Sequence, residues 1–184
     1  MMRKAEILVA AKQLFEHYGF TKTTVADIAR EAGIGVGTVY LEFQSKDSIS
    51  GALCKTHRET ILGAMRDVIE SDGNFSERLV QVLEVRHKGV QETVRGGIHG
   101  EDILFASCPT TKDVNHEFAQ AEEELLGEFL LAGNRAGAFS VSDVPTTARI
   151  ILKIYDAVSP PGEQESLATL HALILGGVLS RHGH

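Results

Sequence analysis

The sequence predicts an all-α fold in which a small N-terminal head of three helices precedes a larger helical body, with about nine helices in total. Apolar residues recur at intervals of three and four along most of the 184-residue chain, which is the period of a helix buried on one side. No segment sustains the alternation of apolar and polar residues that a half-buried strand requires, so no sheet is expected. Glycine, proline and capping residues divide the pattern into separate elements.

The first two helices of the head have clear ends. The first is expected over residues 5–18 and stops at Gly19, which favours the left-handed conformation that ends helices. The second is expected over 24–32. Thr24 is its N-cap, and Asp27, three residues later, completes a capping box in which each residue binds the other's backbone.

A glycine turn separates the second helix from the third. Gly33 ends the second helix, and the third is expected from about 36 to 43. Val39 and Phe43 lie four residues apart and therefore face inward together. Two short helices joined by such a turn, with the second freely presented, form a helix-turn-helix.

Six further helices are expected in the body. Ser45 is suited to cap the first of them, and Phe75 and Ser76 are interpreted as the hydrophobic staple and N-cap of the second. The expected ranges are about 46–70, 76–95, 99–106, 113–137, from Pro145 to before Pro160, and 163–181. The charge run Glu122–Glu124 is interpreted as a solvated helix face.

The last expected helix is apolar almost all round. A terminal helix of this kind must bury both sides, so one side packs on its own domain and the other implies a partner chain. Its glycine pair would let another backbone approach closely. We therefore expect a homodimer whose interface includes Ile151, Leu170, Ile174, Gly177 and Val178.

The charge distribution permits a nucleic-acid partner despite a net charge of −7. Residues 1–60 carry eight Lys/Arg and seven Asp/Glu, whereas residues 61–184 carry ten and eighteen. Phosphate attraction is local, so an acidic body does not prevent binding by a near-neutral head, although it predicts weak non-specific binding. The N-terminus does not resemble a secretory signal and no apolar run is long enough to span a membrane, so a cytoplasmic location is expected.

The third helix has the side chains that a recognition helix needs. Val36, Gly37 and Thr38 are small enough to enter the major groove, and the Tyr40 hydroxyl can reach a phosphate. Lys46 adds a charge and a helix N-terminus beside the DNA backbone, and Thr24 can act in the same way at the other side.

The segment from Ile7 to Lys46 resembles the DNA-binding domain of the TetR family of transcriptional regulators. The matching pattern is Ile7-Leu8-x-x-Ala11-x-x-Leu14-Phe15-x-x-x-Gly19-Phe20-x-x-Thr23-Thr24-Val25-x-x-Ile28-Ala29-x-x-Ala32-Gly33-Ile34-x-x-Gly37-Thr38-Val39-Tyr40-x-x-Phe43-x-Ser45-Lys46. The resemblance covers about residues 5–50, a quarter of the chain.

The resemblance implies a helix-turn-helix DNA-binding domain over 1–46 and an effector-binding and dimerisation domain over 47–184. It also implies that the last two helices form the dimer interface and that a ligand cavity in the body controls the separation of the two heads. By position, the residues expected to touch double-stranded DNA are Thr24, Val36, Gly37, Thr38, Tyr40 and Lys46.

Two positions depart from the family's usual residues. Members often carry a polar or basic residue where Val36 stands, and His or an aromatic residue where Glu42 stands. Val36 can make an apolar contact with a thymine methyl but cannot bond a base edge. Glu42 would repel a nearby phosphate, so we expect it either to point away or to lower affinity, and base readout to depend on Thr38 and DNA shape.

The expected function is a ligand-responsive regulator, most simply a repressor, that binds a palindromic operator as a homodimer and is released by a small, largely apolar effector. The candidate effector-binding residues are aromatic side chains of the body, Phe105, Phe118, Phe129 and Tyr155. The alternative is a DNA-binding regulator without a small effector, either an activator or one controlled by a protein partner.

Other functional classes have little support in the sequence. The glycines at 33, 35 and 37 follow a capped helix instead of a strand, which argues against a dinucleotide loop. His116-Glu117 begins like a zinc motif, but residue 120 is Gln. A metal sensor using His87, His99 and His116 remains a weaker alternative; no cofactor, metal site or catalytic constellation is predicted, so the chain is not expected to be an enzyme.

Overall fold

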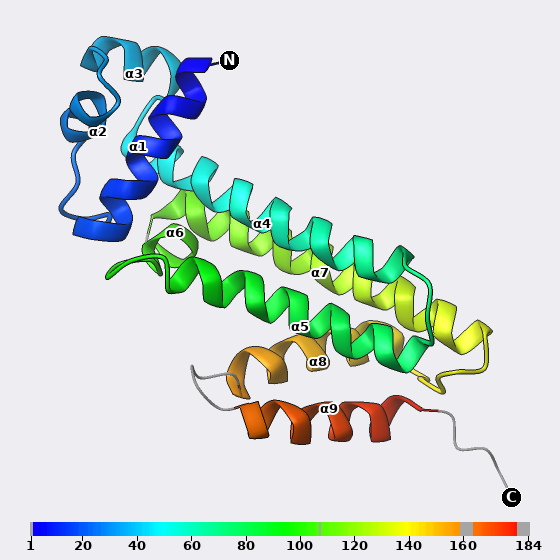
Figure 1. Cartoon of the computed structure of the whole chain (residues 1–184). Coiled ribbons are helices and arrows are strands. Elements are labelled where there is room, and N and C mark those ends of the chain that lie inside the picture. Colours follow the sequence, from blue (N-terminus) through cyan, green and yellow to red (C-terminus); the bar gives the residue numbers. More distant parts are fainter. Residues whose placement is uncertain (1, 107, 159–163, 180–184) are drawn as a thin grey trace, which may run out of the picture. The chain divides into compact units, whose positions relative to one another are not determined.

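The computed structural model describes residues 2–106, 108–158 and 164–179, and within these ranges it contains nine helices. In chain order they are α1 (Met2–Tyr18), α2 (Val25–Glu31), α3 (Val36–Glu42), α4 (Lys46–Glu70), α5 (Phe75–Val94), α6 (Asp102–Phe105), α7 (Pro109–Arg135), α8 (Val144–Val158) and α9 (Gln164–Val178) (Figure 1). An isolated bridge between Phe139 and Leu179 is the only β pairing in the described part. The prediction of an all-α protein is confirmed.

The chain divides into two compact units. The first consists of 1–60 and 90–118, and the second of 61–89 and 119–184. The first unit extends beyond residue 46 because α6 packs against α1, where Ile103 joins the core of the head. The functional division into 1–46 and 47–184 stays a prediction, because compactness does not assign function.

The head of the first unit is built around α1. Its core collects buried side chains from α1, α2 and α3, including Ile7, Phe15, Ile28 and Val39. α1 ends at Tyr18 because Gly19 has a φ of 85°, in the left-handed region that side-chain-bearing residues avoid. The following turn lets α2 return across α1.

The second unit has a separate apolar core. Leu83 from α5, Phe129 from α7, Ile151 from α8 and Ile174 from α9 are all buried in it. α8 and α9 lie side by side in this unit (Figure 1). An aromatic cluster stabilises one part of the core, where the Phe75 ring lies 5.4 Å from Phe129 and 5.8 Å from Phe139.

Several helix ends differ from the prediction. Asn74 caps α5, since its Oδ1 accepts the backbone N–H of Glu77 at 2.8 Å. The prediction of Ser76 as the N-cap is therefore wrong, because Ser76 lies one residue inside the helix. α7 begins at Pro109, earlier than expected, since a proline fits the first turn of a helix, where its missing N–H is not needed.

α6 is shorter than expected for a tertiary reason. The turn before it docks on the end of α1, where the His99 N–H donates to the Glu16 carbonyl at 2.8 Å. The Phe20 N–H likewise donates to Asp102 Oδ2 at 2.6 Å. These bonds hold residues 96–101 in turns, so the helix starts only at Asp102. The expected ends of the last helix, 163 and 181, lie outside the described residues.

Candidate nucleic-acid interface

The start of α2 is held by a complete capping box. Thr24 Oγ1 accepts the Asp27 N–H at 3.1 Å, and Asp27 Oδ2 accepts the Thr24 N–H at 3.0 Å. Three hydrogen bonds lower the pKa of Asp27. The largest effect comes from the Thr24 hydroxyl, followed by the Thr24 backbone N–H and the Arg30 side chain. Thr24 itself is exposed, so its side chain is available at the surface while it caps the helix.

A tight turn places α3 after α2. Gly33 has a φ of 67°, and the Ile34 N–H returns to the Ala29 carbonyl at 3.0 Å. Gly35 is the N-cap residue of α3, and its carbonyl accepts the Thr38 N–H at 2.9 Å. This is the predicted helix-turn-helix, with its second helix ending at Glu42.

α3 is anchored on one side and open on the other. Val39 is fully buried and Phe43, just after the helix, is 5% exposed. On the open side, Val36 is 40% and Tyr40 53% exposed, and a side chain at Gly37 would meet nothing within 4 Å. A helix held in this way can enter a groove without losing its core contacts.

Leu41 is the most exposed large apolar residue of α3, at 84%. It is absent from the predicted DNA contacts, although a helical wheel would have found it. Residue 41 lies one turn after Gly37 on the same face and opposite the buried Val39.

Lys46 holds the head together instead of extending into solvent. Its ammonium nitrogen donates to the carbonyl oxygens of Phe20 at 2.7 Å and Thr23 at 2.9 Å. It also lies 4.3 Å from the centre of the Phe20 ring, a favourable cation–π distance. Lys46 thus ties the first turn of α4 to the loop between α1 and α2.

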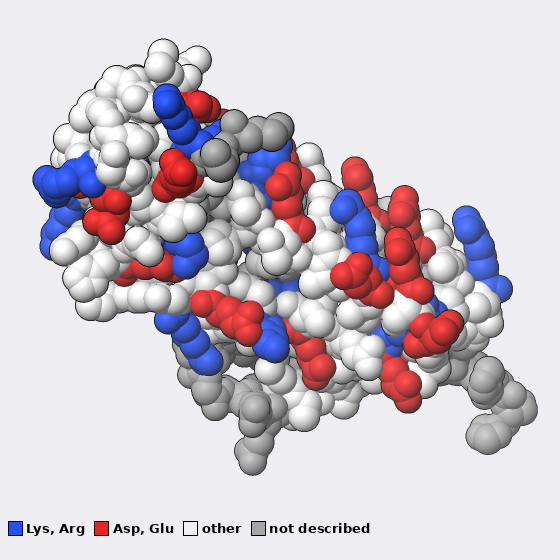
Figure 2. Space-filling model, turned by 45° about the horizontal axis from the view of Figure 1, so that its top comes forward, with Lys and Arg blue, Asp and Glu red and all other residues white. Residues whose placement is uncertain are grey.

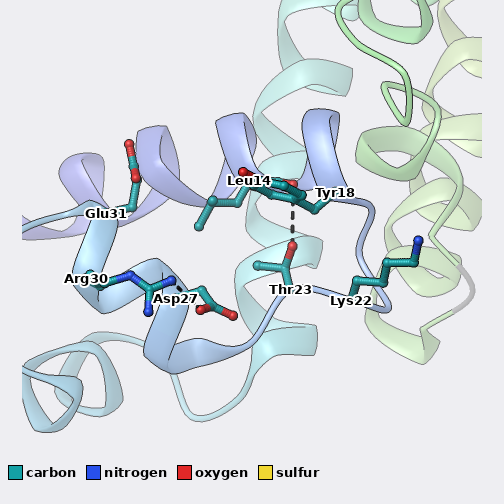
Figure 3. Close-up of a pocket in the computed structure, with 7 residues that line it drawn as sticks. All are labelled: Leu14, Tyr18, Lys22, Thr23, Asp27, Arg30 and Glu31. Carbon is teal, nitrogen blue, oxygen red and sulfur yellow. Dashed lines mark hydrogen bonds and ion pairs between the residues drawn. The ribbon is translucent and has the colours of Figure 1, made fainter.

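The head also has a hollow beside α2. It has a volume of about 290 Å³ and is lined by Leu14, Tyr18, Lys22, Thr23, Asp27, Arg30 and Glu31 (Figure 3). The Thr23 hydroxyl reaches back to the Leu14 carbonyl at 3.4 Å, and Arg30 pairs with Asp27 at 2.6 Å (Figure 3). Two cations and two carboxylates share this lining, so it does not favour ligands of either charge.

Acidic and basic side chains are interspersed on the surface that Figure 2 displays, without a large field of one sign. Clustered cations supply most of the non-specific attraction of a protein to DNA, and this face does not gather them. The expectation of weak non-specific binding stays a prediction.

The comparisons with known proteins agree with this geometry. The family model described as "Bacterial regulatory proteins, tetR family" matches residues 7–53. The transcriptional repressor KstR2 of Rhodococcus jostii is 31% identical over 147 residues, covering 74% of this chain and 68% of KstR2. An uncharacterised HTH-type regulator of Bacillus subtilis, YhgD, is 29% identical over 91% of this chain and 92% of its own length.

The chain belongs to the TetR family. It is a DNA-binding transcriptional regulator and not an enzyme. The fold is also similar to that of solved structures. Reduced NemR of E. coli superposes with a TM-score of 0.78 at 16% identity, covering 100% of both chains. FadR of Bacillus halodurans superposes with a TM-score of 0.75 at 23% identity, covering 97% of both.

Glu42 is exposed at the end of α3 of this TetR-family chain. It therefore does not turn into the protein, and its effect on DNA affinity stays a prediction.

The predicted effector-binding residues fall into both compact units. Phe105 and Phe118 belong to the first unit, where Phe105 is half exposed and lies 5.8 Å from the Arg58 guanidinium. Phe129 and Tyr155 are buried in the core of the second unit. Phe129 packs among other phenylalanines, which is the role of a core residue.

Tyr155 joins a buried polar site that the sequence did not predict. Its hydroxyl lies 2.9 Å from His171 Nε2, and the two rings are stacked. Burial, and then the charge of Glu84, raises the pKa of Tyr155 to about 12. The His87 ring approaches Tyr155 edge-on at 5.8 Å.

Arg86 is the charged centre of the same unit. Its Nε donates to Glu122 at 2.9 Å, and its terminal nitrogens donate to the Asp156 carboxylate at 2.6 and 3.1 Å. Burial alone would lower the pKa of Arg86, but the two carboxylates outweigh it and raise the pKa. Glu122 is 2% exposed, so the prediction that Glu122–Glu124 is a solvated face is wrong at its first residue.

The residues predicted for the dimer interface lie mostly inside one chain. Ile151, Leu170, Ile174 and Val178 are buried in the core of the second unit. Gly177 is exposed. The assignment of these residues to a dimer interface stays a prediction.

Two properties of the described residues bear on the remaining predictions. None of the helices in the described part combines the length and apolar character that a membrane span needs. Among the same residues, no group of three His, Cys, Asp or Glu side chains could hold a metal ion.

Proposed function

We propose that this regulator is a homodimeric repressor that binds a palindromic operator and leaves it when a small, largely apolar effector binds the body. One observation carries the proposal. α3 is anchored by the buried Val39 while Val36, Gly37 and Tyr40 stay open to a partner. Repression is supported by the name of KstR2, a transcriptional repressor that is 31% identical.

Homodimerisation is supported by an exposed apolar face on α8 and α9. Ile150 and Ile154, one turn apart on α8, are 48% and 41% exposed, and Leu173 on α9 is 70% exposed. Ala172 and Gly176, also exposed, flank Leu173 with small side chains that permit close helix approach. Large apolar side chains left exposed on two helices that pack together favour a further interface.

A two-fold dimer explains the expected palindrome. Two copies related by a two-fold axis present two identical recognition helices, which match two inverted half-sites about 34–36 Å apart. The predicted DNA contacts Thr24, Val36, Gly37, Thr38 and Tyr40 enter this proposal unchanged. The ammonium group of Lys46 is already bonded to the Phe20 and Thr23 carbonyls. We therefore propose that Lys46 mainly positions the loop before α2 and contacts DNA only in addition.

The effector site is proposed in the body, with Tyr155 as its most informative residue. Ligand sites in proteins are mostly apolar with a few convergent polar groups. Tyr155, His171 and His87 form such a group next to an apolar core. Phe129, buried in the same core, stays a candidate for the apolar part of this lining. Phe105 and Phe118, which belong to the first unit, stay separate predictions and are not assigned to this site.

The decisive test is selection of genomic fragments by the purified protein over a series of salt concentrations. We expect one palindromic site to be enriched, with an affinity that falls steeply with salt. Adding a hydrophobic extract of the source cells should release that site if an apolar effector exists. Enrichment without release would favour the alternative of a regulator without a small effector, and no enrichment at any salt concentration would contradict the proposal.

A further inference from the structure

The outer ridge of α3 consists of a glycine and a leucine. Each residue of a helix turns by about 100°, so residues 37 and 41, two positions before and after Val39, lie opposite the buried face. Gly37 has open space around it, and Leu41 is 84% exposed. The part of α3 that would enter a groove deepest is therefore entirely apolar.

α3 lacks the side chains that read purines most directly. Its sequence, VGTVYLE, contains no Lys, Arg, Asn or Gln, and the structure describes every residue of it. Bidentate contacts to guanine require Arg or Lys, and those to adenine require Asn or Gln. Of the cations nearest α3 in sequence, Lys46 binds backbone carbonyls, and Arg30 makes a surface pair with Asp27.

The exposed side of α3 carries apolar side chains instead of these hydrogen-bonding residues. Val36, Tyr40 and Leu41 together are three exposed large apolar side chains in a helix of seven residues. Thymine is the one base whose major-groove edge carries a methyl group, and that methyl is the apolar feature a leucine can recognise. Packing Leu41 on such a methyl removes both from water, which favours binding.

We propose that α3 selects its half-site through thymine C5-methyl groups, with Leu41 as the principal contact and Val36 as the second. Gly37 lets the helix backbone approach closely enough for both contacts. The inference rests on the proposed binding of α3 in the major groove and adds which bases it selects.

The test begins with a random-sequence duplex library and the full-length protein. The enriched duplex is then synthesised with its natural thymines and as a series in which one thymidine at a time is replaced by deoxyuridine. Deoxyuridine differs from thymidine only by the missing methyl group. We expect at least one position in each half-site where the loss of the methyl weakens binding about fourfold, the effect of one buried carbon. Specific binding that is indifferent to every such replacement would overturn the inference while leaving DNA binding intact.

A variant assigns the methyl contact to Leu41. Leu41→Ala keeps a good helix former at an exposed site, so the head should stay folded, as circular dichroism can check. We expect this variant to lose the thymine preference at one position per half-site. Ile98→Ala, which shortens an equally exposed apolar side chain of the same unit outside α3, should retain it. If Leu41→Ala has the same ratio of affinities for the thymidine and deoxyuridine duplexes as the parent protein, Leu41 is rejected as the contact.

The outcomes separate the inference from the function on which it rests. If the library yields no enriched sequence, both DNA selection and methyl recognition fail together. If a sequence is enriched but contains no thymine within the protected half-sites, only the inference fails. If the thymidine and deoxyuridine duplexes bind with equal affinity, the inference also fails while DNA binding stands.

Discussion

The ammonium nitrogen of Lys46 lies 2.7 Å from the carbonyl oxygen of Phe20 and above the ring of the same residue. A third partner, the Thr23 carbonyl, lies 2.9 Å away. One lysine at the start of α4 therefore satisfies these two backbone acceptors of the loop that leads into α2, and the Thr21 carbonyl lies 3.5 Å from the same nitrogen. The contact joins the start of α4 to the segment that leads into the helix-turn-helix.

Replacing Lys46 by Met should destabilise the head. Met keeps most of the apolar stem but removes the donor, which leaves two carbonyls without their bonds and costs about 1–2 kcal/mol. Urea unfolding followed by circular dichroism measures the free energy of unfolding. Lys22→Met, at an exposed lysine of the same loop, is the matched control and should change it little. Unchanged stability in Lys46→Met would leave phosphate binding as its only role.

Breaking the Arg86–Glu122 pair should be far more costly than removing a surface charge. Glu122→Leu leaves the buried guanidinium paired with the exposed Asp156, and loss of one partner of a buried pair typically costs about 3–5 kcal/mol. Glu124→Leu changes an exposed residue of the same charge run and should have little effect. Chemical unfolding of the two variants distinguishes a buried network from a solvated face.

The double variant Arg86→Met with Glu122→Leu tests whether the two charges act as a pair. Removal of both charges abolishes the uncompensated one, so the double variant should be more stable than Glu122→Leu alone. Additive losses would show that the two side chains contribute independently.

Stability should fall as the pH drops through the ordinary histidine range because of His57. Burial lowers the pKa of His57 below 6.5, and the charge of Lys12 lowers it further against the opposing effect of Glu16. Below about pH 6.5 the unfolded chain therefore binds a proton at this site that the folded chain does not, so the free energy of unfolding decreases. Unfolding curves measured at several pH values in this range give the slope.

His57→Gln should flatten that slope, because glutamine stays neutral and can still meet the Thr93 hydroxyl, which lies 3.4 Å from His57 Nδ1. His17→Gln, at an exposed histidine of the same unit, should keep the slope of the parent protein. Equal slopes in all three proteins would assign the acid sensitivity to other groups.

Adding a methyl group at two glycines should change stability in opposite directions. At Gly97 a Cβ would lie 2.6 Å from the backbone carbonyl oxygen of Glu16, so Gly97→Ala forces the docked turn away at a cost of about 1–3 kcal/mol. At Gly63, inside α4, a Cβ would meet nothing within 4 Å, and Gly63→Ala should stabilise the helix by about 0.5–1 kcal/mol. Thermal melts show both signs.

Leu173→Glu should weaken self-association without unfolding the chain. The side chain is 70% exposed, so a charge there is tolerated by the monomer but opposes an apolar contact with a second copy. Sedimentation equilibrium should give a lower mass than for the parent protein. Leu131→Glu on α7, 42% exposed, provides the comparison and should remain associated. Equal masses for both variants would place the interface elsewhere.

The sequence by itself determined the features that neighbouring residues decide. The capping box of Thr24 and Asp27, the stop at Gly19 and the limits of α4 from Lys46 to Glu70 follow from interactions across three or four residues. The same local pattern identified the helix-turn-helix and its family. The local pattern was wrong at the start of α5, where Asn74 and not Ser76 caps the helix.

Only the tertiary structure decided which charged and apolar side chains are buried. Glu122 belongs to an acidic run, yet it is enclosed because Arg86, on another helix, meets it there. α9 is apolar on several faces, and the packing of α8 decides that Ile174 is covered while Leu173 stays open. Burial depends on partners distant in sequence, and no short-range rule of residue spacing contains that information.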